Sequence, residues 1–155
     1  MQRIEILDYE PRFRHAFRKL NEWWILRYFE MEDKDYKLLY DPQTHVLDKG
    51  GHILIALLEG QPAGTCALVP SDREGFDFEL TKMGVAPEFQ GRGVGIALGE
   101  AILEKARDLG AENIFLESNT MLKPAIELYR KLGFREFSGE KSPYQRCNIQ
   151  MELSL

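Results

Sequence analysis

The sequence predicts an α/β (α+β) protein with one mixed central sheet of about six to seven strands and about four helices on its two faces. Two features support this prediction. Strand-like segments joined by short polar turns run from His52 to Val85, which is typical of an antiparallel meander. A strand, a helix and a further strand then follow from Phe76 to Ser118, and this order indicates a right-handed parallel crossover.

The length and composition are typical of a globular protein. The chain has 155 residues, of which 44% are hydrophobic and 29% are charged, and we expect residues 1–155 to form a single domain. The formal charge is −5, which gives no electrostatic support for general nucleic-acid binding. No apolar run approaches a membrane span and the N-terminus lacks the apolar core of a signal peptide, so we expect a cytoplasmic protein without a membrane partner.

The cysteine and histidine residues do not indicate a metal site. Cys66 and Cys147 are the only cysteines, and neither lies in a Cys-x-x-Cys pattern. Both fall in strand-like segments, so we expect buried thiols of an intracellular protein. His15, His45 and His52 are scattered, with no Ser/His/Asp or Cys/His pattern to connect them. His52 begins a strand that could reach a ligand cleft, and an ordinary surface or core histidine is the alternative.

The N-terminal third is expected to be mostly helical. A helix that starts at Glu10-Pro11 keeps one apolar face, formed by Phe13, Phe17, Leu20 and Trp24. Asp41-Pro42 ends the next helix, because the residue before proline disfavours helical backbone angles. The expected elements are a strand at Arg3–Leu7, the helix from Glu10, a helix at Glu32–Tyr40 and a helical turn at Pro42–Leu47.

The central strands carry two informative patterns. His52–Leu58 is apolar on both faces, which predicts a strand covered on both sides, and Ala63–Val69 returns as its partner. In Phe76–Val85 the apolar residues first occupy even positions and then odd ones. A period of two cannot change phase in this way, so we expect a β-bulge between Leu80 and Met83 or near Gly84.

A glycine-rich turn joins this strand to the next helix. The turn is Gln90–Gly95, and Val94–Leu109 has the apolar spacing of a helix that Gly110 would end. Glycines allow a ligand to approach the backbone, and the free N–H groups of a helix start favour an anion such as phosphate. A turn without a ligand is the alternative. The remaining expected elements are a strand at Asn113–Ser118, a helix at Leu122–Leu132 and a strand pair at Arg135–Ser138 and Gln145–Leu153.

Two blocks of the sequence carry a family resemblance: Gln90-x-x-Gly93-x-Gly95, entered from Met83–Pro87, and Asn119–Phe134. The first resembles the acyl-CoA signature and the second the downstream block of the GNAT superfamily of N-acetyltransferases. The resemblance implies a splayed parallel strand pair and acetyl-CoA as cosubstrate. It also implies transfer of an acetyl group to a primary amine of a small molecule or peptide, and a possible homodimer. The alternative is an acyl-CoA sensor or structural protein with the same fold and no catalysis.

The same resemblance assigns roles to individual residues. Tyr129 would be the general acid toward the leaving thiolate, and a core tyrosine is the alternative. Glu79 would be the general base, with an outward carboxylate paired to Lys82 or Arg73 as the alternative and Glu117 as a second choice. The expected cofactor residues are Met83, Gly84, Val85, Gln90, Gly91, Arg92, Gly93, Val94, Gly95, Ile96, Asn119, Lys123, Ala125 and Tyr129.

The acceptor side is expected to come from the first helices. This region offers aromatic and acidic residues together, a combination that suits a cationic amine, but core aromatics beside an acidic helix start would look the same. Neither cysteine lies in the two motif blocks, so we expect direct transfer rather than a covalent relay. The candidate acceptor residues are Trp23, Trp24, Tyr28, Phe29, Glu30, Glu32, Asp33 and Asp35.

Overall fold

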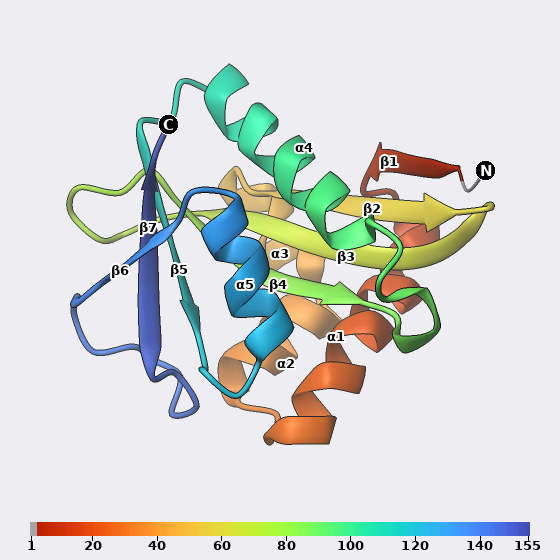
Figure 1. Ribbon diagram of the computed structural model, residues 1–155, viewed down its shortest axis with the longest axis horizontal. Coiled ribbons are helices and arrows are strands. Elements are labelled where there is room, and N and C mark those ends of the chain that lie inside the picture. Colours follow the sequence, from red (N-terminus) through yellow and green to blue (C-terminus); the bar gives the residue numbers. More distant parts are fainter. Residues whose placement is uncertain (1–2) are drawn as a thin grey trace.

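The computed structural model describes residues 3–155, which form a mixed sheet of seven strands in the order β1-β2-β3-β4-β5-β7-β6 (Figure 1). β4 and β5 are parallel, and every other neighbouring pair is antiparallel. The predicted meander and the parallel crossover are therefore both confirmed. The strands are β1 (Ile4–Asp8), β2 (His52–Leu58), β3 (Gln61–Pro70), β4 (Phe78–Val85), β5 (Asn113–Ser118), β6 (Arg135–Phe137) and β7 (Ile149–Ser154).

Helices cover both faces of the sheet. α4 and α5 pack on the face nearer the viewer in Figure 1, and the N-terminal helices pack behind it. Both faces of β2 are apolar because successive residues point to opposite sides of the sheet. Leu54, Ala56 and Leu58 join one core, whereas Ile53, Ile55 and Leu57 join the other. The α-helices are α1 (Arg14–Tyr28), α2 (Asp33–Tyr40), α3 (Pro42–His45), α4 (Val94–Asp108) and α5 (Lys123–Lys131).

The predicted bulge lies in β4. Thr65 of β3 pairs with Gly84 and Ala67 pairs with Thr81, so Lys82 and Met83 lie opposite the single residue Cys66. Lys82 is the residue with the unusual backbone, at φ +52°. The pairing of β4 with β5 ends at Leu80, and beyond it the two strands separate. The end of β4 is thus free on its β5 side.

Some predicted boundaries need correction. The segment Gln145–Asn148 is not part of the last strand, which begins at Ile149. The Gln145 N–H and the side chains of Arg146 and Asn148 bond to other parts of the chain instead. The first helix begins as a short 3-10 turn at Pro11–Phe13 before α1. Its buried face continues through Asn21 and Ile25, which the apolar pattern did not identify.

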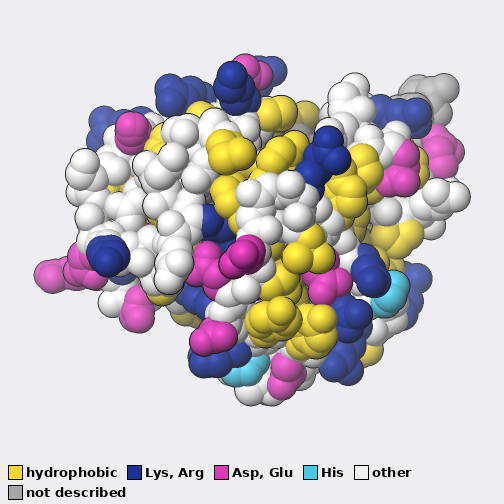
Figure 2. Space-filling view, turned by 90° about the horizontal axis from the view of Figure 1, so that it is seen from below, with side chains coloured by type: hydrophobic (Ala, Val, Ile, Leu, Met, Phe, Trp, Pro, Cys, Tyr) yellow, Lys and Arg dark blue, Asp and Glu magenta, His cyan; other side chains and the backbone are white. Residues whose placement is uncertain are grey.

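None of the helices within residues 3–155 is long and apolar enough to span a membrane. The surface is chemically mixed. Hydrophobic side chains gather in the middle of the lower face shown in Figure 2, and acidic and basic side chains surround and interrupt them.

Candidate active site

A cleft opens where β4 and β5 separate, and it holds a cavity of about 400 Å³. Its walls come from the end of α1, the second half of β4, the glycine turn, the start of α5 and the segment 144–147. This places ligand-binding space at the carboxyl end of a parallel strand, the usual position in α/β folds. Of the predicted cofactor residues, only Arg92 and Lys123 do not line the cavity.

The glycine turn has the geometry of an anion site. Gly91 and Gly93 have φ angles of +78° and +84°, which side chains on L-residues disfavour. Gly93 is the N-cap of α4, and no side chain caps this helix start. The first N–H groups of α4, beginning with Val94, therefore face the cavity with the positive end of the helix dipole. The Gln90 amide donates to the Val85 carbonyl at 3.3 Å and so joins the turn to the end of β4.

Gly84 has a packing role besides lining the cavity. A Cβ atom there would lie 2.9 Å from Trp24 Cδ1 and 3.1 Å from the Leu20 carbonyl oxygen. The absence of a side chain lets α1 pack directly on β4. Trp24 is held in turn by its indole N–H, which donates to Asn21 at 3.0 Å. The N-terminal helix therefore forms the floor of the cleft.

Tyr129 projects from α5 into the cavity wall and is 8% exposed. Its ring packs edge-on against Phe134, with 6.1 Å between centroids. Burial raises the pKa of its hydroxyl, so the group keeps its proton at neutral pH. Within residues 3–155 no hydrogen bond holds this hydroxyl, which is compatible with donation to a ligand in the cleft.

Only one of the two candidate carboxylates belongs to a residue that lines the cavity. Glu79 does not line the cavity: it is buried on the side of the sheet that faces α2, 3.9 Å from Lys34 Nζ, and burial raises its pKa. Glu117, at the end of β5, does line the cavity. Its Oε2 accepts hydrogen bonds from Arg73 at 2.8 Å and Gln150 at 3.0 Å. In the described part of the chain no donor reaches the other oxygen, Oε1.

Asn119 lines the cavity, but its polar atoms bond within the chain. Its amide donates to the Arg146 carbonyl at 2.7 Å, and its side-chain oxygen accepts from the Met121 N–H at 2.8 Å. Asn119 thus fixes the turn before α5 and attaches the segment 144–148 to it. Of the three histidines, none lines the cavity.

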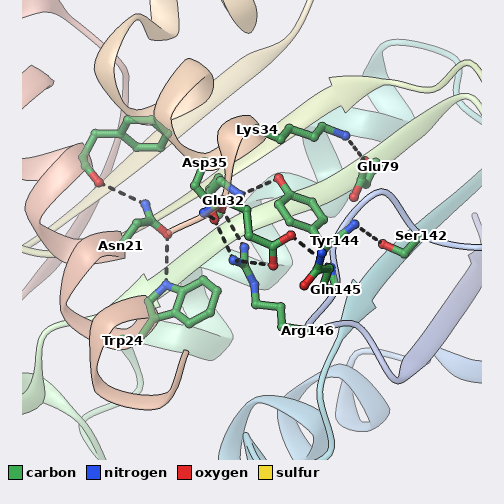
Figure 3. A network of polar contacts seen from close by, with 12 residues as sticks. Asn21, Trp24, Glu32, Lys34, Asp35, Glu79, Ser142, Tyr144, Gln145 and Arg146 are labelled. Carbon is green, nitrogen blue, oxygen red and sulfur yellow. Dashed lines mark hydrogen bonds and ion pairs between the residues drawn. The ribbon is translucent and has the colours of Figure 1, made fainter. Parts of the chain in front are cut away.

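The aromatic residues expected on the acceptor side do line the cavity, but the acidic residues do not. Asp35 is fully buried and accepts two hydrogen bonds of 2.6 Å from Arg146 (Figure 3). It accepts a third, of 2.8 Å, from Lys82. Burial opposes ionisation of Asp35, but the bonds from Arg146 and the charge of Lys82 outweigh it and lower its pKa to about 2. This carboxylate is therefore not free to bind a cationic amine.

The sequence did not identify the other members of this network. Lys82, Tyr144 and Arg146 all line the cavity, and the Lys82 ammonium also donates to the Tyr144 hydroxyl at 2.8 Å. Burial lowers the pKa of Lys82 to about 8, although Asp35 opposes the change. A lysine at the bulge of a strand that is covered on both faces is the signal that could have drawn attention to it.

The two cysteines differ. Cys66 is buried as expected, whereas Cys147 is only half-buried and lines the cavity, which corrects the expectation for this residue. Its place in the segment 144–147 brings it into the wall. Burial raises the pKa of the Cys147 thiol, so it is a poor nucleophile at neutral pH.

The splayed strands, the bulge and the open helix start define an acyltransferase fold. The chain belongs to the acetyltransferase (GNAT) family, whose model matches residues 16–134. It is 30% identical to an uncharacterized N-acetyltransferase of Escherichia coli, YjgM, over 97% of this chain and 92% of that protein. This relationship confirms the predicted family.

Solved structures agree with this assignment. A GNAT-family acetyltransferase of Staphylococcus aureus superposes with a TM-score of 0.85 at 18% identity, covering 98% of this chain and 99% of that one. A putative acetyltransferase of Salmonella typhimurium, yncA, solved with its cofactor acetyl-CoA, gives a TM-score of 0.75 at 18% identity, with 98% and 94% covered. At such identities these structures establish the fold alone.

Proposed function

We propose that this protein is an N-acetyltransferase that moves the acetyl group of acetyl-CoA to a primary amine by direct attack in a ternary complex. The observation that carries the proposal is that the open glycine turn, Tyr129 and Glu117 all line one cleft. Membership of the GNAT family supports an acyltransferase, and the acetyl-CoA bound to the Salmonella protein supports this cosubstrate.

The turn fits the pyrophosphate of such a cosubstrate. A Cβ atom at Gly91 would meet nothing within 4 Å, so the space above the turn is open to a ligand. The uncapped N–H groups of α4 supply donors there. When bound, acetyl-CoA would supply an activated thioester carbonyl. Because β4 has no partner on its β5 side beyond Leu80, backbone N–H groups near Val85 would hold the carbonyl oxygen.

Two side chains would move protons. An amine of ordinary pKa is protonated at neutral pH, and the free oxygen of Glu117 would accept its proton before attack. Tyr129 would donate its hydroxyl proton to the departing sulfur. Glu117 is preferred to Glu79 because Glu79 lies outside the cavity. The raised pKa of the Cys147 thiol argues against a covalent relay through this residue.

Thermal unfolding with and without excess acetyl-CoA tests the binding step. At one hundred times its dissociation constant the ligand should stabilise the protein by about 2.7 kcal/mol and raise Tm by about 5–11 °C. In Gly93→Glu the added carboxylate would meet the phosphates, and the shift should vanish. Gly75→Glu is the matched control, because Gly75 also has a positive φ of +89° but lies outside the cavity. No shift in the folded wild type would contradict the proposal.

Release of free thiol across a panel of amines tests catalysis. Tyr129→Phe and Glu117→Gln should each lower turnover by about 10²- to 10⁴-fold, the usual contribution of a general acid or base. Glu79→Gln should have a smaller effect. If Glu79→Gln lowered turnover more than Glu117→Gln does, Glu79 rather than Glu117 would be the general base. Tight binding of acetyl-CoA without thiol release for any amine would favour the acyl-CoA sensor.

A further inference from the structure

The bulge in β4 is occupied by a residue that its backbone conformation does not favour. Lys82 has φ +52°, and within residues 3–155 the only other non-glycine residue with a positive φ is Glu59, in a tight turn. Glycine would adopt this conformation freely. Lys82 is also 3% exposed, although lysine is among the residues least often buried. Both observations call for a specific role of its side chain.

The side chain ends in a fully paired ionic cluster. The ammonium of Lys82 donates to Asp35 Oδ1 and to the Tyr144 hydroxyl, each at 2.8 Å. Arg146 binds the same carboxylate through both terminal nitrogens and lies 3.6 Å from Glu32. Lys82 and Arg146 thus balance the charges of Asp35 and Glu32. These contacts fix the direction of the Lys82 side chain.

The cluster joins parts of the chain that face the cleft from different sides. Glu32 accepts a hydrogen bond from the Gln145 N–H at 3.0 Å, and its own N–H donates to Asp35 at 2.9 Å (Figure 3). The start of α2, the bulge and the segment 144–146 therefore meet in one network, in which Asp35, Lys82 and Tyr144 are buried. Met83, Gly84 and Val85, which follow the bulge directly, line the cavity.

Stability alone does not account for this arrangement. A buried ion pair adds little net stability compared with apolar residues of similar size. A glycine would remove the backbone strain, and a methionine would fill the same space without burying a charge. Lysine does neither, but it anchors the bulge through its ammonium group.

We propose that Lys82 is a positioning residue for acyl transfer: its ammonium, held by Asp35 and Tyr144, fixes the bulge of β4 and thereby directs the backbone N–H groups that follow it toward the acyl carbonyl. This inference rests on the proposed function, because it assumes that acetyl-CoA lies along β4. It concerns the acyl group alone. The phosphate contacts at the glycine turn should not depend on Lys82.

Isothermal titration calorimetry with acetyl-CoA and with CoA separates these contributions without an acceptor. The wild type should bind acetyl-CoA about threefold to tenfold more tightly than CoA, the value of one hydrogen bond. Lys82→Met should lose this preference and keep its affinity for CoA. Lys105→Met is the matched control, since Lys105 pairs with Asp8 at 2.9 Å outside the cavity. Lys82→Gly removes the backbone strain together with the ammonium group. If the ammonium anchor maintains the preference for acetyl-CoA over CoA, this variant should lose the preference too.

Tyr144→Phe keeps the test decisive if Lys82→Met does not fold, since it removes one acceptor of Lys82 without unpairing a charge. It should reduce the preference partially. The inference would be overturned if wild type, Lys82→Gly and Tyr144→Phe showed the same preference for acetyl-CoA over CoA. It would also be overturned if the wild type bound both ligands equally. Both outcomes would leave the proposed function standing. A wild type that binds neither ligand would overturn both.

Discussion

The glycine turn at one end of the cleft is made of backbone from a single stretch, Gln90–Ile96, whereas the other end is held by side chains from three distant parts of the chain. Asp35 and Lys82 are 47 residues apart, and Asp35 and Arg146 are 111 apart. The first end needs only local geometry, because glycines and an uncapped helix supply its donors. The second needs the whole sheet to be assembled before its charges can meet.

The largest expected effect on stability comes from removing the carboxylate that holds the second end of the cleft. Asp35→Ala would leave Lys82 and Arg146 buried without their shared carboxylate, and we expect a loss of about 3–5 kcal/mol in the free energy of unfolding, measured with urea. Asp33→Ala, at an exposed site two residues earlier, should change it by less than about 0.5 kcal/mol. Similar losses in both variants would show that buried charge does not hold this end of the cleft.

Acid should reproduce part of that effect. The pKa of Asp35 is lowered from 3.8 to about 2, so the stability that it contributes is present above pH 4 and is lost as the pH falls toward 2. The expected loss is about 2 kcal/mol. Asp77 also has a lowered pKa, so the measurement should compare urea unfolding of wild type and Asp35→Asn over this range. If their stabilities decline in parallel, the Asp35 contribution is absent.

The smallest effect concerns the glycine end. Gly91→Ala places a Cβ at φ +78° with no atom within 4 Å. The variant should therefore suffer only backbone strain, which should lower its free energy of unfolding by about 1 kcal/mol. Gly110→Ala has the same open surroundings at φ +82° and should lose the same amount. Only Gly91→Ala should also weaken acetyl-CoA binding, measured as the ligand-induced shift in Tm. Equal shifts in both variants would mean that the turn does not contact the ligand.

The difference between the two ends also explains what could be predicted from the sequence. The meander, the bulge and the glycine turn are local patterns, and all three are confirmed. The sequence favours Glu79 over Glu117 as the general base, but only Glu117 lines the cavity. Both residues lie in strands that are covered on two sides. Alternation therefore does not say which residue faces the cleft.

Lys82 shows a further limit of sequence patterns. The change of phase in β4 placed a bulge between Leu80 and Met83 or near Gly84, but it could not indicate that Lys82 would bond to Asp35 and Tyr144. The segment Gln145–Asn148 was predicted as strand because it adjoins a true strand. Its polar side chains instead bond to residues that are distant in the sequence, and no local pattern reports such contacts.

The loop that carries Tyr144 and Arg146 lies beyond residue 134, where the match to the family model ends. The matched region thus contains the glycine turn and Tyr129 but not this part of the cleft wall. Two proteins could agree at every matched position and still present different walls to an incoming amine. Comparative work on acceptor choice in this family should therefore begin with the loop before the last strand.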